Sequence, residues 1–182
     1  MTDRMRILEL CLKESAFAFD WLAKGNCMSC TRGYLSFMLF VASEENGIAF
    51  QLTYRYSAFD RIYHELTSAN IFPGTRIIES VQPVSAWSLM GVSGDMRRLA
   101  EKVDKVADEL SNRIITPKDN LKFLKSFKAH HPLVSIANEE MLSALAMGDN
   151  AAALAVANEC LLSGQYGDGL CTRVSDYIKY RT

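Results

Sequence analysis

The sequence predicts an α+β fold: an N-terminal helix, an antiparallel sheet of about five strands with one intervening helix, and a helical C-terminal third. Apolar residues recur at helical spacing at the start of the chain and throughout its last part, whereas β-branched and aromatic residues dominate the stretches between. The strands also come in groups and do not alternate singly with helices. This order disfavours a parallel, doubly wound sheet.

The length of the chain, 182 residues, favours one domain over several. Within a single domain spanning residues 1–182, we expect residues 1–92 to form the sheet part and residues 93–182 to form a helical part packed on it. A chain of this length buries roughly 70% of the surface of its unfolded state, so neither a metal nor a disulfide is needed for stability.

Residues 4–23 are predicted to form the first helix, because Leu8, Leu12 and Phe19 recur near the helical period. Gly25 follows as a candidate for the left-handed residue that ends a helix. The period then changes, and a short strand is expected at residues 27–31.

A β-hairpin is predicted at residues 33–56, where β-branched and aromatic residues dominate. Asn46 and Gly47 mark its turn, because both residue types tolerate a positive φ angle.

Helical spacing returns at residues 57–72, and two further strands are expected at residues 75–82 and 83–92. The second of these begins at Pro83 or runs along a sheet edge, because proline cannot donate a hydrogen bond to a neighbouring strand.

The remainder of the chain is predicted to be helical. Thr116 and Pro117 have the residue types that favour the cap and the first position of a helix. Gly148 and Asp149 join the two arms of a helical hairpin, whose second arm is dense in alanine. The expected helices cover residues 94–113, 117–129, 134–147, 150–162 and 171–180.

The charge balance is near neutral, with 20 lysines and arginines against 21 acidic residues, which disfavours a nucleic-acid partner. No apolar run reaches the roughly 18 residues that span a bilayer, and the first residues lack the uninterrupted apolar core of a signal peptide. We therefore expect a cytoplasmic protein that has no membrane partner. Composition does not predict the oligomeric state.

Cys27 and Cys30 form a Cys-x-x-Cys motif, which is found in zinc sites and in redox pairs. No second pair of ligands follows at a recognised spacing, and the motif does not lie at the start of a helix. Residues three apart in a strand point to opposite faces. We therefore expect two structural thiols, with no metal and no cofactor, while zinc or redox chemistry stays an alternative.

His130 and His131 are the candidates for acid–base chemistry, and Lys122 and Lys125 could hold a phosphate beside them. Lys118 lies on the same helical stripe. The alternative is a histidine at a helix C-terminus and a solvated lysine face. The first reading implies a small hydrolase or another phosphate-binding enzyme.

Tyr54, Arg55, Tyr56 and Trp87 are the candidates for partner binding, because tyrosine, arginine and tryptophan dominate binding hot spots. Alternation along the strand places Tyr54 and Tyr56 on one face and Arg55 on the other. If the tyrosine face is the core face, both tyrosines are core aromatics.

Several stretches resemble a group of small, uncharacterised bacterial α+β proteins: FAFDWLAKGN, TRGYLSFMLFVAS, IAFQLTYRY and LAMGDNAAALAVA. Such proteins resemble the immunity or antitoxin partners encoded beside polymorphic bacterial toxins. The resemblance implies a non-catalytic immunity protein that binds and neutralises a cognate toxin or effector domain, and it implies no catalytic residues.

Overall fold

The computed structural model describes residues 3–69, 72–84, 86–132, 135–163 and 169–181. The chain divides into two compact units. The sheet unit comprises Met1–Arg55 and Gly74–Asn112, and the helical unit comprises Tyr56–Pro73 and Arg113–Thr182.

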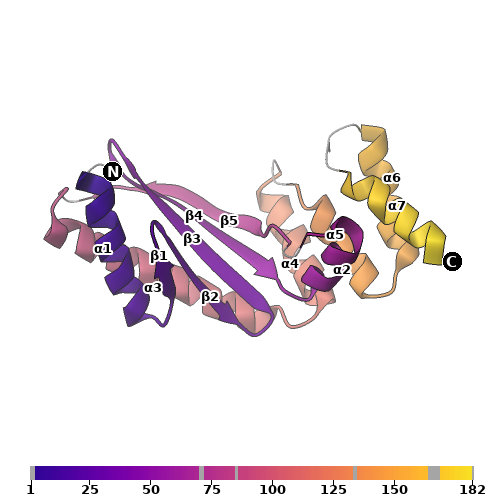
Figure 1. Ribbon diagram of the computed structural model, residues 1–182, viewed down its shortest axis with the longest axis horizontal. Helices are drawn as coiled ribbons and strands as arrows, with labels where there is room; N and C mark the ends of the chain where they lie inside the picture. Colours follow the sequence, from indigo (N-terminus) through magenta and orange to yellow (C-terminus); the bar gives the residue numbers. More distant parts are fainter. Residues whose placement is uncertain (1–2, 70–71, 85, 133–134, 164–168, 182) are drawn as a thin grey trace. The chain divides into compact units, whose positions relative to one another are not determined.

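The sheet unit contains one sheet of five strands in the order β1-β2-β3-β4-β5 (Figure 1). Neighbouring strands are antiparallel, so the predicted α+β class is confirmed. Its elements are α1 (Asp3–Ala18), β1 (Leu22–Lys24), β2 (Cys27–Arg32), β3 (Leu35–Glu44), β4 (Gly47–Tyr56), β5 (Thr75–Gln82) and α3 (Leu89–Arg113).

Helices α1 and α3 cover one face of this sheet. The long helix α3 runs along the strands in Figure 1. Its residue Asp95 accepts a hydrogen bond from the Gln82 side chain through its backbone carbonyl, at 3.1 Å. Helix α1 contacts α3 where Ser93 Oγ donates to Glu14 Oε2 at 3.4 Å. The apolar side chains of Leu8, Leu12, Val92, Met96, Leu99 and Val103 are buried on these two helices. Although the sequence suggests grouping residues 93–113 with the helical part, α3 belongs to the sheet unit.

The predicted hairpin at residues 33–56 corresponds to β3 and β4, but Gly47 has a different role from the one expected. Its φ angle is not positive. A Cβ atom added at Gly47 would lie 2.2 Å from the carbonyl oxygen of Gln82. Close approach of β5, and not turn geometry, therefore requires a glycine here.

The strand expected at residues 83–92 is wrong. Helix α3 begins at Leu89, and the Ser88 hydroxyl accepts a hydrogen bond from the backbone N–H of Gly91 at 3.2 Å. This side-chain cap satisfies one of the N–H groups that the first turn leaves unpaired. It starts the helix five residues before the predicted position of 94.

The fifth strand is instead β1, whose first two residues, Leu22 and Ala23, fall within the predicted first helix. Helix α1 ends at Ala18, and Asp20 adopts a left-handed conformation with a φ angle of 57°. The chain then reverses, and the backbone N–H of Trp21 donates to the carbonyl of Ala16 at 2.8 Å. Gly25 therefore lies in the β1–β2 turn and does not end the helix.

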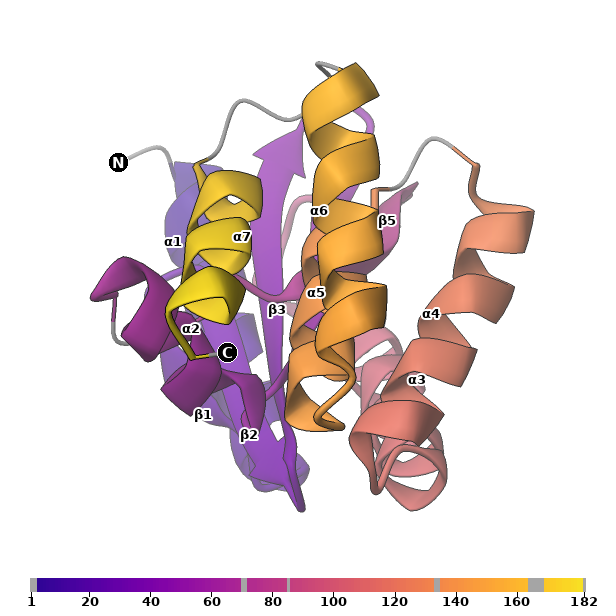
Figure 2. The ribbon, with the colours of Figure 1, turned by 90° about the vertical axis from the view of Figure 1, so that its right-hand side faces the viewer.

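The helical unit consists of α2 (Phe59–Thr67), α4 (Pro117–His130), α5 (Ala137–Ala146), α6 (Asn150–Ser163) and α7 (Leu170–Arg181) (Figure 2). Helices α5 and α6 form the predicted hairpin, and Gly148 between them has a φ angle of 75°. The expected start of α5 at residue 134 lies outside the described residues, as do residues 70–71 of the predicted stretch 57–72.

The N-terminal cap of α4 confirms the sequence prediction. Thr116 caps the helix, Pro117 follows it, and Thr116 and Asp119 form a reciprocal capping box. Across the described ranges, we find no helix with both the length and the apolar character that a bilayer crossing demands.

Candidate functional site

One face of the sheet is not covered by helices α1 and α3. On β3, four alternate side chains are buried: Leu35, Phe37, Leu39 and Val41. The residues between them point to the other face, because successive side chains of a strand alternate. Among these, Met38 is 40% exposed and Phe40 is 41% exposed. We call this second surface of the sheet the open face.

Strand pairing extends the open face across β2 to β1. Met38 lies opposite Ser29, which lies opposite Leu22. Phe40 is likewise paired with Cys27 on the neighbouring strand. Leu22 is 79% exposed, although an antiparallel sheet usually presents polar side chains to water.

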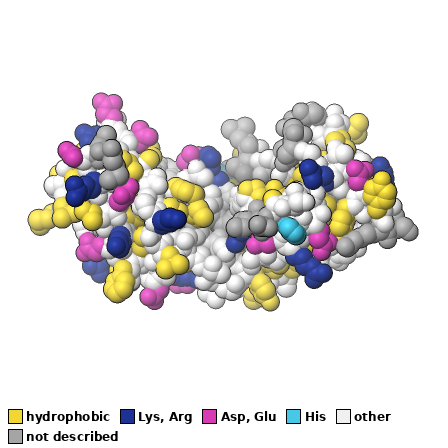
Figure 3. All heavy atoms as spheres, viewed as in Figure 1, with side chains coloured by type: hydrophobic (Ala, Val, Ile, Leu, Met, Phe, Trp, Pro, Cys, Tyr) yellow, Lys and Arg dark blue, Asp and Glu magenta, His cyan; other side chains and the backbone are white. Residues whose placement is uncertain are grey.

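The open face continues over β4 and β5. Val81, which is 51% exposed, lies opposite Ala49, and Glu79 lies opposite Gln51. Apolar and polar side chains are therefore mixed on this surface, as they are at interfaces between proteins that also exist separately. On the side of the molecule drawn in Figure 3, hydrophobic and charged side chains are also interspersed.

Arg55 is the one predicted partner-binding residue whose side chain lies on the open face. Its Nη2 atom is 3.4 Å from the Ser36 hydroxyl, which lies 3.1 Å from the Thr31 hydroxyl. These contacts place the half-buried guanidinium beside polar groups of β2 and β3.

Tyr54 and Tyr56 belong to the core. Tyr54 is 2% exposed, and its ring centroid lies 6.4 Å from that of Phe37. Tyr56 is 3% exposed, packs edge-on against Phe59 and donates its hydroxyl to the Ile115 carbonyl at 2.9 Å. The alternative of core aromatics therefore describes both tyrosines, and neither presents its ring on the surface.

Trp87 precedes α3 and lies in no strand, so the prediction that it extends the same sheet is wrong. Its ring is half-buried, and the Arg4 guanidinium carbon lies 4.8 Å from the ring centroid. This cation–π contact links the start of α1 to the segment before α3.

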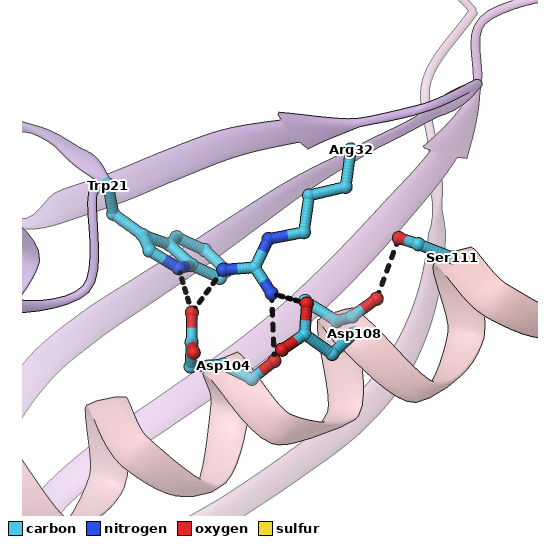
Figure 4. Close-up of polar contacts among 6 residues, drawn as sticks. Trp21, Arg32, Asp104, Asp108 and Ser111 are labelled. Atoms are coloured by element: carbon cyan, nitrogen blue, oxygen red, sulfur yellow. Dashed lines mark hydrogen bonds and ion pairs between the residues drawn. The ribbon is translucent and has the colours of Figure 1, made fainter.

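A polar cluster on the covered face joins α3 to the strands (Figure 4). Trp21 Nε1 donates to Asp104 Oδ1 at 2.7 Å. The Arg32 guanidinium pairs with the carboxylates of Asp104 and Asp108 and also donates to the Asp104 carbonyl at 3.3 Å. Sequence reasoning missed this cluster, because its contacts join residues that lie 72 to 83 positions apart and carry no local signal.

Cys27 and Cys30 lie on opposite faces of β2, as the strand prediction implied. Cys30 shares the covered face with Arg32, and burial raises its pKa to about 11. Burial also raises the pKa of Cys27. Both groups are thus protonated thiols near neutral pH. In the described ranges, no cluster of three or more histidine, cysteine or acidic side chains could hold a metal ion.

The histidines that end α4 make local contacts. His130 Nδ1 lies 2.8 Å from the Ser126 carbonyl oxygen, and the exposed His131 ring stacks on Phe127 with 4.3 Å between centroids. The His131 backbone N–H donates to the carbonyls of Phe127 and Lys128. Both histidines therefore fit the helix-end alternative.

Asp119 lies near the start of α4, at the opposite end of the helix from these histidines. The Thr116 side chain donates a hydrogen bond to Asp119 and so lowers the pKa of that carboxyl. A helix rises about 1.5 Å per residue, so Asp119 lies roughly 16 Å along α4 from His130. Lys122 borders a hollow of about 240 Å³ beside Asp119, and Lys125 Nζ lies 3.8 Å from Glu140 Oε1.

We compared the chain with known protein families, curated proteins and solved structures, and none of them matches it.

Proposed function

We propose that the chain is a non-catalytic protein that binds another protein through the open face of its sheet. The observation that carries this proposal is the exposure of Leu22, Met38, Phe40 and Val81 on a sheet face that neither α1 nor α3 covers. The solvent-facing side of an antiparallel sheet normally carries polar residues. The exposed apolar side chains therefore indicate a surface that is covered in a complex.

The mixed chemistry of the open face supports a partner that also exists on its own. Met38 and Phe40 supply apolar contact, while Arg55 and Glu79 supply charge at its margins. Arginine and aromatic residues contribute most of the binding energy at such interfaces. Arg55 therefore keeps its proposed role, now in combination with Phe40 and Met38.

The finer form of the proposal is a cytoplasmic bacterial immunity protein that neutralises a cognate toxin or effector domain. It follows from the sequence resemblance described above. Such a complex would bury on the order of 1,600 Å² in total.

Co-purification with the product of the adjacent gene tests the proposal. We expect the wild-type chain to retain this product, and Phe40→Glu to lose it, because a charge would be buried without a partner at the interface. Phe17→Glu on α1 is the matched control: Phe17 is 87% exposed and lies off the open face. Both variants should keep the wild-type melting temperature within a few degrees, since exposed substitutions change stability by about 0.5 kcal/mol.

Retention of the product by Phe40→Glu would exclude the open face as the interface. Failure of the wild-type chain to bind the product at micromolar concentration would exclude the immunity role for that gene pair.

A further inference from the structure

A groove of about 370 Å³ runs between α1 and the first edge of the sheet. Arg6, Glu9, Leu10 and Lys13 of α1 line one side, and Ala23 and Gly25 line the other. Among the described residues, β1 is the terminal strand of the sheet, and no strand pairs with its outer side. The groove therefore exposes an unpaired strand edge with a helix as its second wall.

The strand register determines which backbone groups point into the groove. The backbone N–H of Val41 donates to the Asn26 carbonyl at 2.9 Å, so Asn26 and Val41 form a hydrogen-bonded pair between the segments. Hydrogen-bonded and non-hydrogen-bonded pairs alternate along an antiparallel ladder. The next residue, Cys27, therefore directs its N–H and carbonyl away from β3 and toward β1, where it pairs with Lys24. Ala23, one residue before Lys24, therefore directs its N–H and carbonyl away from β2.

The side chains of α1 give the groove a pattern of charge. Arg6, Glu9 and Lys13 follow one another along one side of the helix, at intervals of three and four residues. Arg6 and Lys13 are exposed, and Glu9 is half-buried between them. The lining thus alternates positive, negative and positive over about 10 Å of helix.

A strand added to β1 would place its side chains against this pattern. Residues directly opposite each other in a sheet share a face, and Ala23 shares its face with the buried Met28, on the helix side. The residue opposite Ala23 would therefore direct its side chain toward α1. Its neighbours two positions away would do the same, about 6.6 Å to either side.

We propose that this groove binds an extended peptide segment of a partner protein by strand addition to β1. The segment pairs its backbone with the N–H and carbonyl of Ala23. Its side chains on the α1 side are acidic, basic and acidic at alternate positions, so that their charges are opposite to those of Arg6, Glu9 and Lys13. The groove is a different surface from the open face, so this inference and the proposed function fail independently.

Titration of the full-length, ¹⁵N-labelled protein with synthetic peptides tests the inference. The probe is the blocked heptapeptide Thr-Glu-Val-Lys-Val-Glu-Thr, added to about 1 mM because weak binding is accessible at that concentration. We expect saturable shifts of the amide resonances of Ala23 and Gly25. The charge-inverted peptide Thr-Lys-Val-Glu-Val-Lys-Thr should bind at least about tenfold more weakly, as should Arg6→Glu with the original peptide.

An N-methyl group on the central lysine amide of the peptide separates strand addition from charge attraction alone. It removes the donor to the Ala23 carbonyl while leaving all charges and the protein unchanged, and should abolish the shifts. In the protein, Ala23→Pro should have a parallel effect, because proline is tolerated where the N–H points away from the ladder. Equal binding of the methylated or the charge-inverted peptide, or no shift with the original one, would overturn the inference.

Discussion

Tyr54 and Arg55 are neighbours in β4, yet their side chains belong to different surfaces. Tyr54 packs in the core against Phe37, whereas Arg55 lies on the open face beside Ser36. Replacing each residue by alanine therefore has distinct consequences.

Tyr54→Ala should lower the free energy of unfolding by about 3–5 kcal/mol, because truncating a buried aromatic leaves a cavity. Arg55→Ala should lower it by less than about 1 kcal/mol and should weaken partner binding instead. Chemical denaturation of both variants, run beside a binding assay, measures the two effects. A Tyr54→Ala protein as stable as the wild type would contradict its placement in the core.

The Cys30 thiol predicts a dependence of stability on alkaline pH. Its pKa in the folded protein is about 11, raised mainly by burial from an ordinary value of 9.0. The fold therefore favours the protonated thiol, and this contribution is complete below pH 9.0 and is lost as the pH rises toward 11.

The difference in unfolding free energy between the wild type and Cys30→Ala should be constant up to about pH 9 and should shrink above it. Denaturant titrations at several pH values measure this difference, in which the titrations of other groups cancel. A difference that stays level beyond pH 10 would show that burial does not shift this thiol.

At the scale of elements, the ion pairs of Arg32 join α3 to β2. Asp104 also accepts a hydrogen bond from Trp21, and its side chain is 19% exposed, whereas that of Asp108 is 61% exposed. Loss of the Asp104 carboxylate is therefore more costly than loss of the Asp108 carboxylate, because the polar groups of Trp21 and Arg32 that it leaves unpaired are less accessible to water.

Asp104→Ala should therefore destabilise the protein by about 1–3 kcal/mol, and Asp108→Ala by no more than about 1 kcal/mol. Thermal melts with calorimetry give both values, and Asp108→Ala serves as the control because it also removes a carboxylate from Arg32. Equal losses in the two variants would contradict the dominant role of Asp104.

Gly47 and Gly94 form a second pair for comparison. A Cβ at Gly47 would meet the backbone of β5, whereas a Cβ at Gly94 within α3 would meet nothing within 4 Å. Gly47→Ala should lower the melting temperature, since backbone atoms must move. Gly94→Ala should raise stability by up to about 1 kcal/mol, because alanine favours helix. A neutral Gly47→Ala would show that β5 adapts readily.

The elements that the sequence predicts well are those with local signals. The α4 start depends on Thr116, Pro117 and Asp119, which lie within four consecutive positions, so the capping signal is local. Strand β1 was not predicted, because three residues carry no periodicity and its pairing with β2 decides its conformation. The segment before Leu89 reads as a strand by composition, yet the Ser88 cap begins a helix there.

The candidate site shows the same division between local and distant information. Alternation along β4 correctly separates Arg55 from the two tyrosines, because side-chain direction is a local property. Which of the two faces is the core face depends on where α1 and α3 pack, and the α3 sequence lies well beyond β4. The open face therefore becomes visible only when strands β1 to β5 are aligned.

At the scale of the whole molecule, only one of the two compact units carries the proposed binding surfaces. The open face and the α1–β1 groove both belong to the sheet unit. The helical unit contains His130 and His131, which make helix-end contacts. Both proposed binding surfaces therefore lie on one unit, and the open face is the main one.

The most direct test of this central claim is the solvent accessibility of methionine methyl groups in the protein with and without its partner. Met38 is 40% exposed on the open face, and Met90 is 89% exposed at the start of α3, off that face. With ¹³C-methyl labels and a soluble paramagnetic agent, relaxation enhancement should fall at Met38 on saturation with the partner and remain at Met90. A bound complex in which Met38 keeps its full enhancement would contradict the claim that the open face is the interface.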